Sequence, residues 1–84
     1  MVNALPVLME NMPSVQVHRR LLGHNVWSTR KRVGFSQEKL AEKANLSAIF
    51  ISRIERGVES PSVDNLVKIS KALGVKAADL VAGF

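Results

Sequence analysis

The chain has 84 residues, no cysteine and a formal net charge of +5, from twelve Lys or Arg against seven Asp or Glu. This length predicts one domain, whose small core must rely on well-packed helices, on a partner subunit, or on both. The lack of cysteine excludes a disulfide framework and a thiolate metal site, and no segment approaches the roughly 20 apolar residues that a membrane-spanning helix needs.

The chain begins with MVNALPVLMENMPSV, a mildly apolar stretch that we interpret as an N-terminal extension over residues 1–15. Pro6, Glu10 and Pro13 interrupt this stretch and it lacks a basic n-region, so a signal peptide is not expected and we expect a cytoplasmic protein. A strand is conceivable only near residues 5–8. Three roles of the extension stay open: a dimer arm, a partner-binding segment or a disordered leader.

The folded domain is placed at residues 16–84, and its first helix is predicted to begin at about residue 16 or 19 and to end at Val33. Its inner face consists of residues three or four positions apart, namely Leu22, Val26, Thr29 and Val33. Gly34 follows, as is typical of a helix C-terminus. Trp27 falls beside this face, where the extension could cover it.

Two short helices joined by a tight turn are predicted within residues 37–56, QEKLAEKANLSAIFISRIER. Apolar or small residues recur at helical spacing in both segments, at Leu40, Ala41, Ala44, Leu46, Ile51 and Ile54. Ser36 and Ser47 each precede a helix and can cap it. Asn45 can adopt the left-handed conformation that the turn needs, and Leu46 can then enter the core. The pattern is that of a helix-turn-helix.

Two further helices complete an all-α, five-helix domain. Ser62 is predicted to cap the fourth helix and Gly74 to end it. The inner stripe of this helix is expected to contain Val63, Leu66, Ile69, Ser70 and Leu73. The fifth helix is short, at about residues 77–81.

Positive charge is concentrated on the motif and on the helix before it. Residues 18–56 contain nine Lys or Arg against three acids, a net +6, whereas residues 57–84 balance three against three. Such a patch attracts the phosphate backbone of a nucleic acid. The alternative is a solvated basic surface that maintains solubility.

Three segments at matching spacings carry a family resemblance: GFSQEKLAEKANLS (34–47), ISRIERG (51–57) and PSVDNLVKISKALGV (61–75). Together they resemble the helix-turn-helix domain of the phage lambda and 434 repressor family, often called XRE-like, over roughly residues 21–80. The resemblance implies a compact five-helix lambda-repressor-like domain and a sequence-specific DNA-binding transcriptional regulator of the repressor or controller type. The second helix of the motif would read the major groove of double-stranded DNA, and the protein would bind a two-fold operator as a homodimer.

The base-reading residues follow from the core positions of the second motif helix. If Ile51 and Ile54 face inward, four residues project outward: Ala48, Ile49, Ser52 and Arg53. Arg53 could grip guanine O6 and N7, or instead contact a phosphate or form a surface ion pair. Ala48 and Ile49 could pack on thymine methyls, although relatives often carry polar residues there.

The expected phosphate contacts are Gln37, Ser47, Phe50, Arg56 and Ser60. Gln37 resembles a family glutamine that holds a phosphate at a helix N-terminus, while Phe50 could instead fill the boundary of the core. Glu59 stands where relatives frequently have a basic residue, so its negative charge is expected to weaken phosphate binding in this region.

Four further basic residues are candidates for diffuse phosphate attraction, namely Arg19, Arg20, Lys31 and Arg32. The family resemblance aligns Arg30 and Glu55 with a structural ion pair, so Arg30 is not expected to contact DNA.

No enzyme, metal or cofactor is expected. His18 and His24 are the only histidines and have no neighbouring carboxylate pair or cysteine. A dimer surface could involve Leu80, Val81 and Phe84 in the C-terminal stretch or the apolar residues of the extension, although core packing explains them equally well. The second function class is a protein-interaction module or antitoxin of the same fold, acting on a protein partner through the extension.

Overall fold

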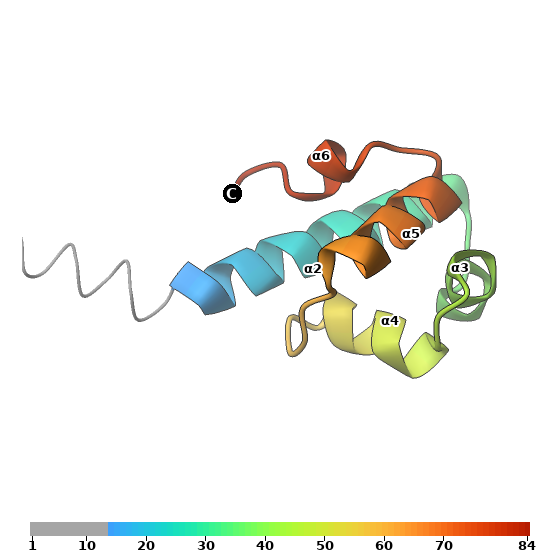
Figure 1. The fold of residues 1–84 in the computed structure, drawn as a ribbon, viewed down its shortest axis with the longest axis horizontal. Helices are drawn as coiled ribbons and strands as arrows, with labels where there is room; N and C mark the ends of the chain where they lie inside the picture. The colour runs from blue at the N-terminus through green and yellow to red at the C-terminus, as the bar shows by residue number, and fades with distance from the viewer. Residues whose placement is uncertain (1–13) are drawn as a thin grey trace, which may run out of the picture.

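The computed structural model describes residues 14–84 as five helices joined by turns and short loops, with no strand in this range (Figure 1). The helices are α2 (Ser14–Val33), α3 (Gln37–Ala44), α4 (Ala48–Glu55), α5 (Val63–Leu73) and α6 (Ala77–Leu80). The all-α, five-helix prediction is therefore confirmed. The expectations for the extension before residue 14, including a strand at residues 5–8, lie outside the described residues.

The longest helix, α2, begins slightly earlier than expected, because neither Gly nor Pro interrupts residues 14–22. Its inner face is formed by Leu22, Val26 and Arg30 at intervals of four residues, each less than a tenth exposed. The predicted position Val33 was wrong, since it is exposed, and Thr29 is only partly buried. Arg30 lies on the inner face instead, because the carboxylate of Glu55 in α4 neutralises its charge there.

The helix-turn-helix has the caps and the turn that were predicted. The hydroxyl of Ser36 accepts a hydrogen bond from the amide of Lys39 at 2.9 Å. The hydroxyl of Ser47 accepts one from Phe50 at 3.0 Å. Asn45 has a left-handed backbone with a φ of 58°. These local bonds satisfy helix-end amides and set the angle between α3 and α4.

All five helices contribute to one core. Six residues have fully buried side chains, namely Val26, Leu40, Ile51, Ile54, Ile69 and Leu80. α4 packs against α2 and α3, while α5 packs against α3 and α6. None of the helices in residues 14–84 is long and apolar enough to cross a bilayer.

One expectation for the C-terminal half was wrong. Val63 is 76% exposed rather than part of the inner stripe, because it is the first residue of α5, one turn before Leu66 packs against the core. Of the two roles left open for Leu80, core packing is the one observed, since its side chain is completely buried in the core of its own chain.

The C-terminal segment is held along α2. The side-chain amide of Asn25 donates to the carbonyl oxygens of Leu80 and Ala82, both at 2.9 Å. The ring of Phe84 stacks on His18 with a centroid distance of 4.9 Å. This arrangement leaves Phe84 half exposed beside the first turns of α2.

α2 crosses α4 at very short range. Gly23 faces the last turn of α4, and a Cβ at this position would collide with the carbonyl oxygens of Ile54 and Glu55. Glycine is therefore required here for close helix packing, and this contact fixes the position of α4 on the domain.

Candidate nucleic-acid interface

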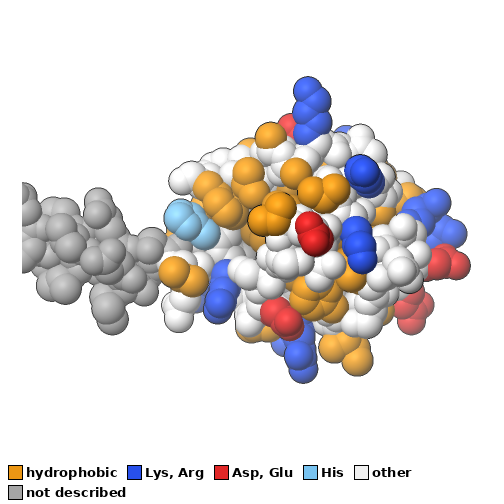
Figure 2. Space-filling view, in the orientation of Figure 1, with side chains coloured by type: hydrophobic (Ala, Val, Ile, Leu, Met, Phe, Trp, Pro, Cys, Tyr) orange, Lys and Arg blue, Asp and Glu red, His pale blue; other side chains and the backbone are white. Residues whose placement is uncertain are grey.

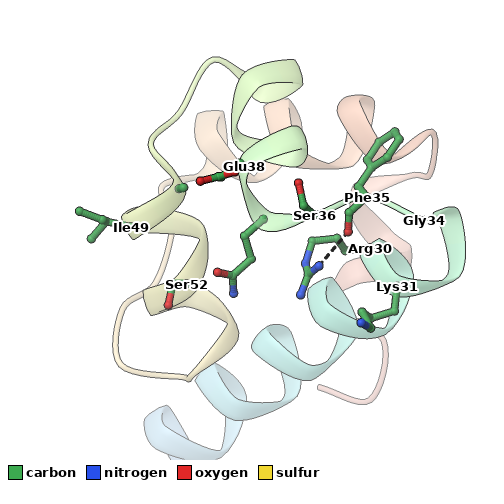
Figure 3. A pocket seen from close by; sticks show the side chains of 10 residues that line it. Arg30, Lys31, Gly34, Phe35, Ser36, Glu38, Ile49 and Ser52 are labelled. Atoms are coloured by element: carbon green, nitrogen blue, oxygen red, sulfur yellow. Dashed lines mark hydrogen bonds between the residues drawn. The ribbon is translucent and has the colours of Figure 1, made fainter.

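The four predicted base-reading residues of α4 are not equally available on its surface. Ile49 is 68% exposed and points away from α4 (Figure 3). Arg53 is exposed and Ser52 is partly exposed. Ala48 is partly buried against the core, so only its outer side can meet a ligand.

Beside α4 lies an open groove of about 670 Å³, shown in Figure 3. It is bordered by the end of α2 and by the N-terminal ends of α3 and α4. The lining residues are Arg30, Lys31, Gly34, Phe35, Ser36, Gln37, Glu38, Ala48, Ile49 and Ser52. Two helix N-termini therefore open onto one surface, and their free amides and dipoles favour an anion there.

A buried ion pair underlies this groove. Arg30 Nε donates to Glu55 Oε2 at 2.6 Å and Arg30 Nη2 donates to Glu55 Oε1 at 3.0 Å. Arg30 Nη1 also donates to the carbonyl oxygen of Phe35 at 2.8 Å. The guanidinium thus joins α2, the segment before α3 and the end of α4, and its donors are used within the protein.

Gln37 belongs to the same network, which the sequence did not reveal. Its side-chain amide donates to Glu55 Oε1 at 3.0 Å, so the amide group is held by the protein. A phosphate near Gln37 would meet the backbone amide of the α3 N-terminus and the remaining face of this side chain. Nothing in the spacing of residues 37 and 55 could have indicated the contact, because it depends on how α3 and α4 pack.

The other predicted phosphate contacts lie around the two ends of α4. Ser47 caps its N-terminus, and Phe50 is partly buried against the core. At the C-terminal end, Arg56 is exposed, and its Nε donates to the hydroxyl of Ser52 at 3.3 Å. Ser60 is exposed in the following loop.

Arg53 forms a long ion pair across this surface. Its Nη1 lies 3.6 Å from Glu59 Oε1, and the two side chains are 55% and 40% exposed. An exposed pair of this kind contributes about 0–1 kcal/mol, so it restrains Arg53 only weakly.

The face that carries α5 has a different character. Figure 2 shows it in the orientation of Figure 1, with α4 along the lower edge; hydrophobic side chains gather on this face, and basic and acidic side chains are interspersed. Within residues 14–84, no group of three His, Cys, Asp or Glu side chains is arranged to hold a metal ion.

Comparison with known proteins gives concordant results. A family model described as helix-turn-helix matches residues 28–80. The control protein C.BamHI of Bacillus amyloliquefaciens is 48% identical over 64 residues, which cover 75% of this chain and 79% of that protein.

Two solved structures share the fold. The restriction-modification controller protein C.AhdI of Aeromonas hydrophila has a TM-score of 0.75 and 28% identity, over 76% of this chain and 97% of its own. The P22 c2 repressor bound to a synthetic operator has a TM-score of 0.70 and 30% identity, over 75% and 96% of the two chains.

Proposed function

This chain belongs to the helix-turn-helix family of DNA-binding transcriptional regulators, and we propose that it acts as a dimeric repressor or controller that reads the major groove with α4. The observation that carries this proposal is the outward side of α4, where Ile49 and Arg53 are exposed and Ser52 is partly exposed, set beside a groove onto which the N-termini of α3 and α4 open. A helix of this kind fits the major groove, with the residues of its first turns nearest the base edges. The proposed place of action is the cytoplasm.

Arg53 is the proposed reader of guanine. A bidentate contact from arginine to guanine O6 and N7 contributes about 1–3 kcal/mol of discrimination. This gain exceeds the roughly 0–1 kcal/mol that the exposed pair with Glu59 contributes. Arg53 can therefore exchange the carboxylate for a base without a net loss.

The apolar residues of α4 suit thymine. Ile49 is the most exposed of the four proposed base-reading residues, and an aliphatic side chain can pack on a thymine methyl group. Ala48 offers a smaller contact surface of the same kind, while the hydroxyl of Ser52 can bond to several bases. We expect a site in which one guanine is followed or preceded by A·T pairs.

Phosphate contacts are proposed on both sides of this reading surface. Gln37 and Ser47 lie at the N-termini of α3 and α4, where backbone amides favour an anion. Phe50 is proposed to touch the sugar-phosphate edge with the exposed part of its ring. Arg56 and Ser60 flank the C-terminal end of α4 and supply a second set of contacts.

A homodimer is proposed because a single α4 offers few base contacts, and two-fold dimers double them on half-sites about one helical turn apart. The proposed dimer surface is centred on Phe84, which is 52% exposed, and on Val15 and Val17 in the first turn of α2. Phe84 stacks on His18 of the same helix, so these apolar side chains lie at one end of the molecule.

The proposal is tested by selecting bound duplexes from a random DNA pool at physiological salt, with Arg53→Ala beside the native chain. We expect a two-fold motif whose guanine preference relaxes in the variant. An enriched motif that is identical for the variant would remove Arg53 from its role, and failure to enrich any motif would contradict base reading by this chain.

A second candidate function is an interaction module that binds a protein partner. Ile49 favours it, because a side chain that is both apolar and 68% exposed on the reading helix also suits a protein surface. A stable complex with another protein and no measurable affinity for duplex DNA would support this alternative.

A further inference from the structure

The region beside the C-terminal end of α4 receives an additional arginine from α2. A Cβ placed on Gly57 would lie 3.2 Å from Cγ and 3.4 Å from Cα of Arg20. Arg20 therefore stands directly against the residue that follows α4 and opens the loop to α5. Gly57 itself has a φ of 76°, which turns the chain at this point.

The charge of Arg20 is not compensated by the described part of the chain. Arg20 is exposed and takes part in none of the ion pairs or side-chain hydrogen bonds within residues 14–84. The ion pairs in this range are Arg30–Glu55, Lys39–Glu42 and Arg53–Glu59. Arg19 also lacks an acidic partner there, and its buried Nε has no hydrogen-bond acceptor. Arg20 thus brings a positive charge that is uncompensated within residues 14–84 to the end of α4.

Other donors surround the same point. Arg56 precedes Gly57 in the chain and is exposed, with only the 3.3 Å bond from its Nε to Ser52. The backbone amides of Glu59 and Ser60 donate no hydrogen bond within the described range, residues 14–84. The one acid of the loop, Glu59, lies 3.6 Å from Arg53 in the DNA-free protein and loses this partner when Arg53 binds a base.

We propose that Arg20 is a phosphate-binding residue that holds one DNA backbone phosphate together with Arg56 beside the loop that follows α4. Arginine suits this ligand because its planar guanidinium donates two parallel hydrogen bonds to phosphate oxygens. The ligand is the DNA backbone because Arg56 directly follows α4, which carries the reading residue Arg53. This inference rests on the proposed function.

The assignment also explains how the loop tolerates Glu59. An acid beside a phosphate is unfavourable, and Arg20 supplies a compensating positive charge from a different helix. Arg20 lies outside residues 28–80, which match the family model, so this contact extends the interface beyond that region.

The test measures binding of a fluorescent duplex by anisotropy over a range of KCl concentrations. The proteins are the native chain, Arg20→Gln, Arg20→Lys and the matched control Lys71→Gln. Lys71 lies in the last turn of α5, which packs mainly on α3, α6 and α2 rather than on α4. Far-UV circular dichroism confirms that each variant is folded.

Each phosphate contact contributes about −0.9 to the slope of log K against log salt. We expect the slope of Arg20→Gln to be shallower by about 0.9, so between about 50 and 200 mM salt this variant loses roughly threefold less affinity than the native chain. Arg20→Lys and Lys71→Gln should keep the native slope. Selected and random duplexes should be weakened equally by Arg20→Gln, because a phosphate contact carries no base preference.

A native slope for Arg20→Gln, with DNA binding retained, would overturn the assignment of Arg20 and leave the proposed function intact. Equal loss of slope in Lys71→Gln would also overturn it, because the effect would then be one of net charge. If the native chain binds no duplex even at low salt, the proposed function fails and this inference fails with it.

Discussion

The ion pair between α2 and α4 leads to a quantitative prediction about stability. Arg30 and Glu55 share two hydrogen bonds, at 2.6 and 3.0 Å, and their side chains are only 9% and 4% exposed. Arg30→Met removes the cation and leaves a buried carboxylate with the amide of Gln37 as its side-chain donor. Loss of one partner from a buried pair costs about 3–5 kcal/mol.

This loss is large for a small domain. Total stabilities are about 5–15 kcal/mol, and a change of 1 kcal/mol shifts Tm by about 4–8 °C in a domain of this size. Arg30→Met is therefore expected to lower Tm by at least about 12 °C. The free energy of unfolding would be measured by urea titration with far-UV circular dichroism.

Two companion variants separate charge from geometry. Arg30→Lys keeps the charge but cannot span both carboxylate oxygens and the carbonyl of Phe35, so a loss of about 1.5–3 kcal/mol is expected. The double variant Arg30→Met with Glu55→Met removes both charges and should be more stable than Arg30→Met alone. A loss below about 1 kcal/mol in Arg30→Met, or strict additivity in the double variant, would show that the two charges do not stabilise each other in the folded protein.

Three further variants test other parts of the structure. Gly23→Ala should cost about 1–3 kcal/mol of stability, because its methyl group meets the carbonyl oxygens of α4. The control Ser28→Ala, on the exposed side of α2, should be nearly neutral in the same urea titration. Equal losses in the two variants would contradict the close crossing of α2 and α4. Ser47→Ala should cost about 1 kcal/mol through loss of the α4 cap, and an unchanged urea midpoint would show that the cap is dispensable. Phe84→Ser should shift sedimentation toward the monomer while the helical signal is kept; an unaltered dimer would place the interface elsewhere.

Local chemistry explains why the helix-turn-helix could be predicted from the sequence. Ser36, Asn45 and Ser47 act on backbone groups within three or four residues, so their roles depend little on the rest of the fold. The same holds for Gly34 and Gly74, whose positive φ angles end α2 and α5.

Features that depend on how the helices pack could not be predicted in this way. Periodicity placed Val63 on the inner stripe, yet α5 reaches the core only from Leu66. Leu80 looked like surplus apolar surface, but α6 folds back on α2 and α5 and buries it. In both cases, burial is decided by the neighbouring helix rather than by the segment itself.

The interface shows the same division. The outward-facing residues of α4 could be predicted from its buried positions. The ion pair between Arg30 and Glu55 could be predicted only from the family resemblance. The contact between Gln37 and Glu55 and the approach of Arg20 to Gly57 each join two different helices or their ends. They required the three-dimensional structure, because no sequence spacing encodes them.

Methylation interference on the selected DNA site tests most directly whether α4 reads the major groove. Dimethyl sulfate methylates guanine N7 in the major groove and adenine N3 in the minor groove, so the two grooves are probed in one experiment. If α4 reads the major groove, guanine methylation should block binding at two positions about one helical turn apart, and Arg53→Ala should abolish this interference. Interference from adenine alone, or guanine interference that persists in Arg53→Ala, would contradict this prediction.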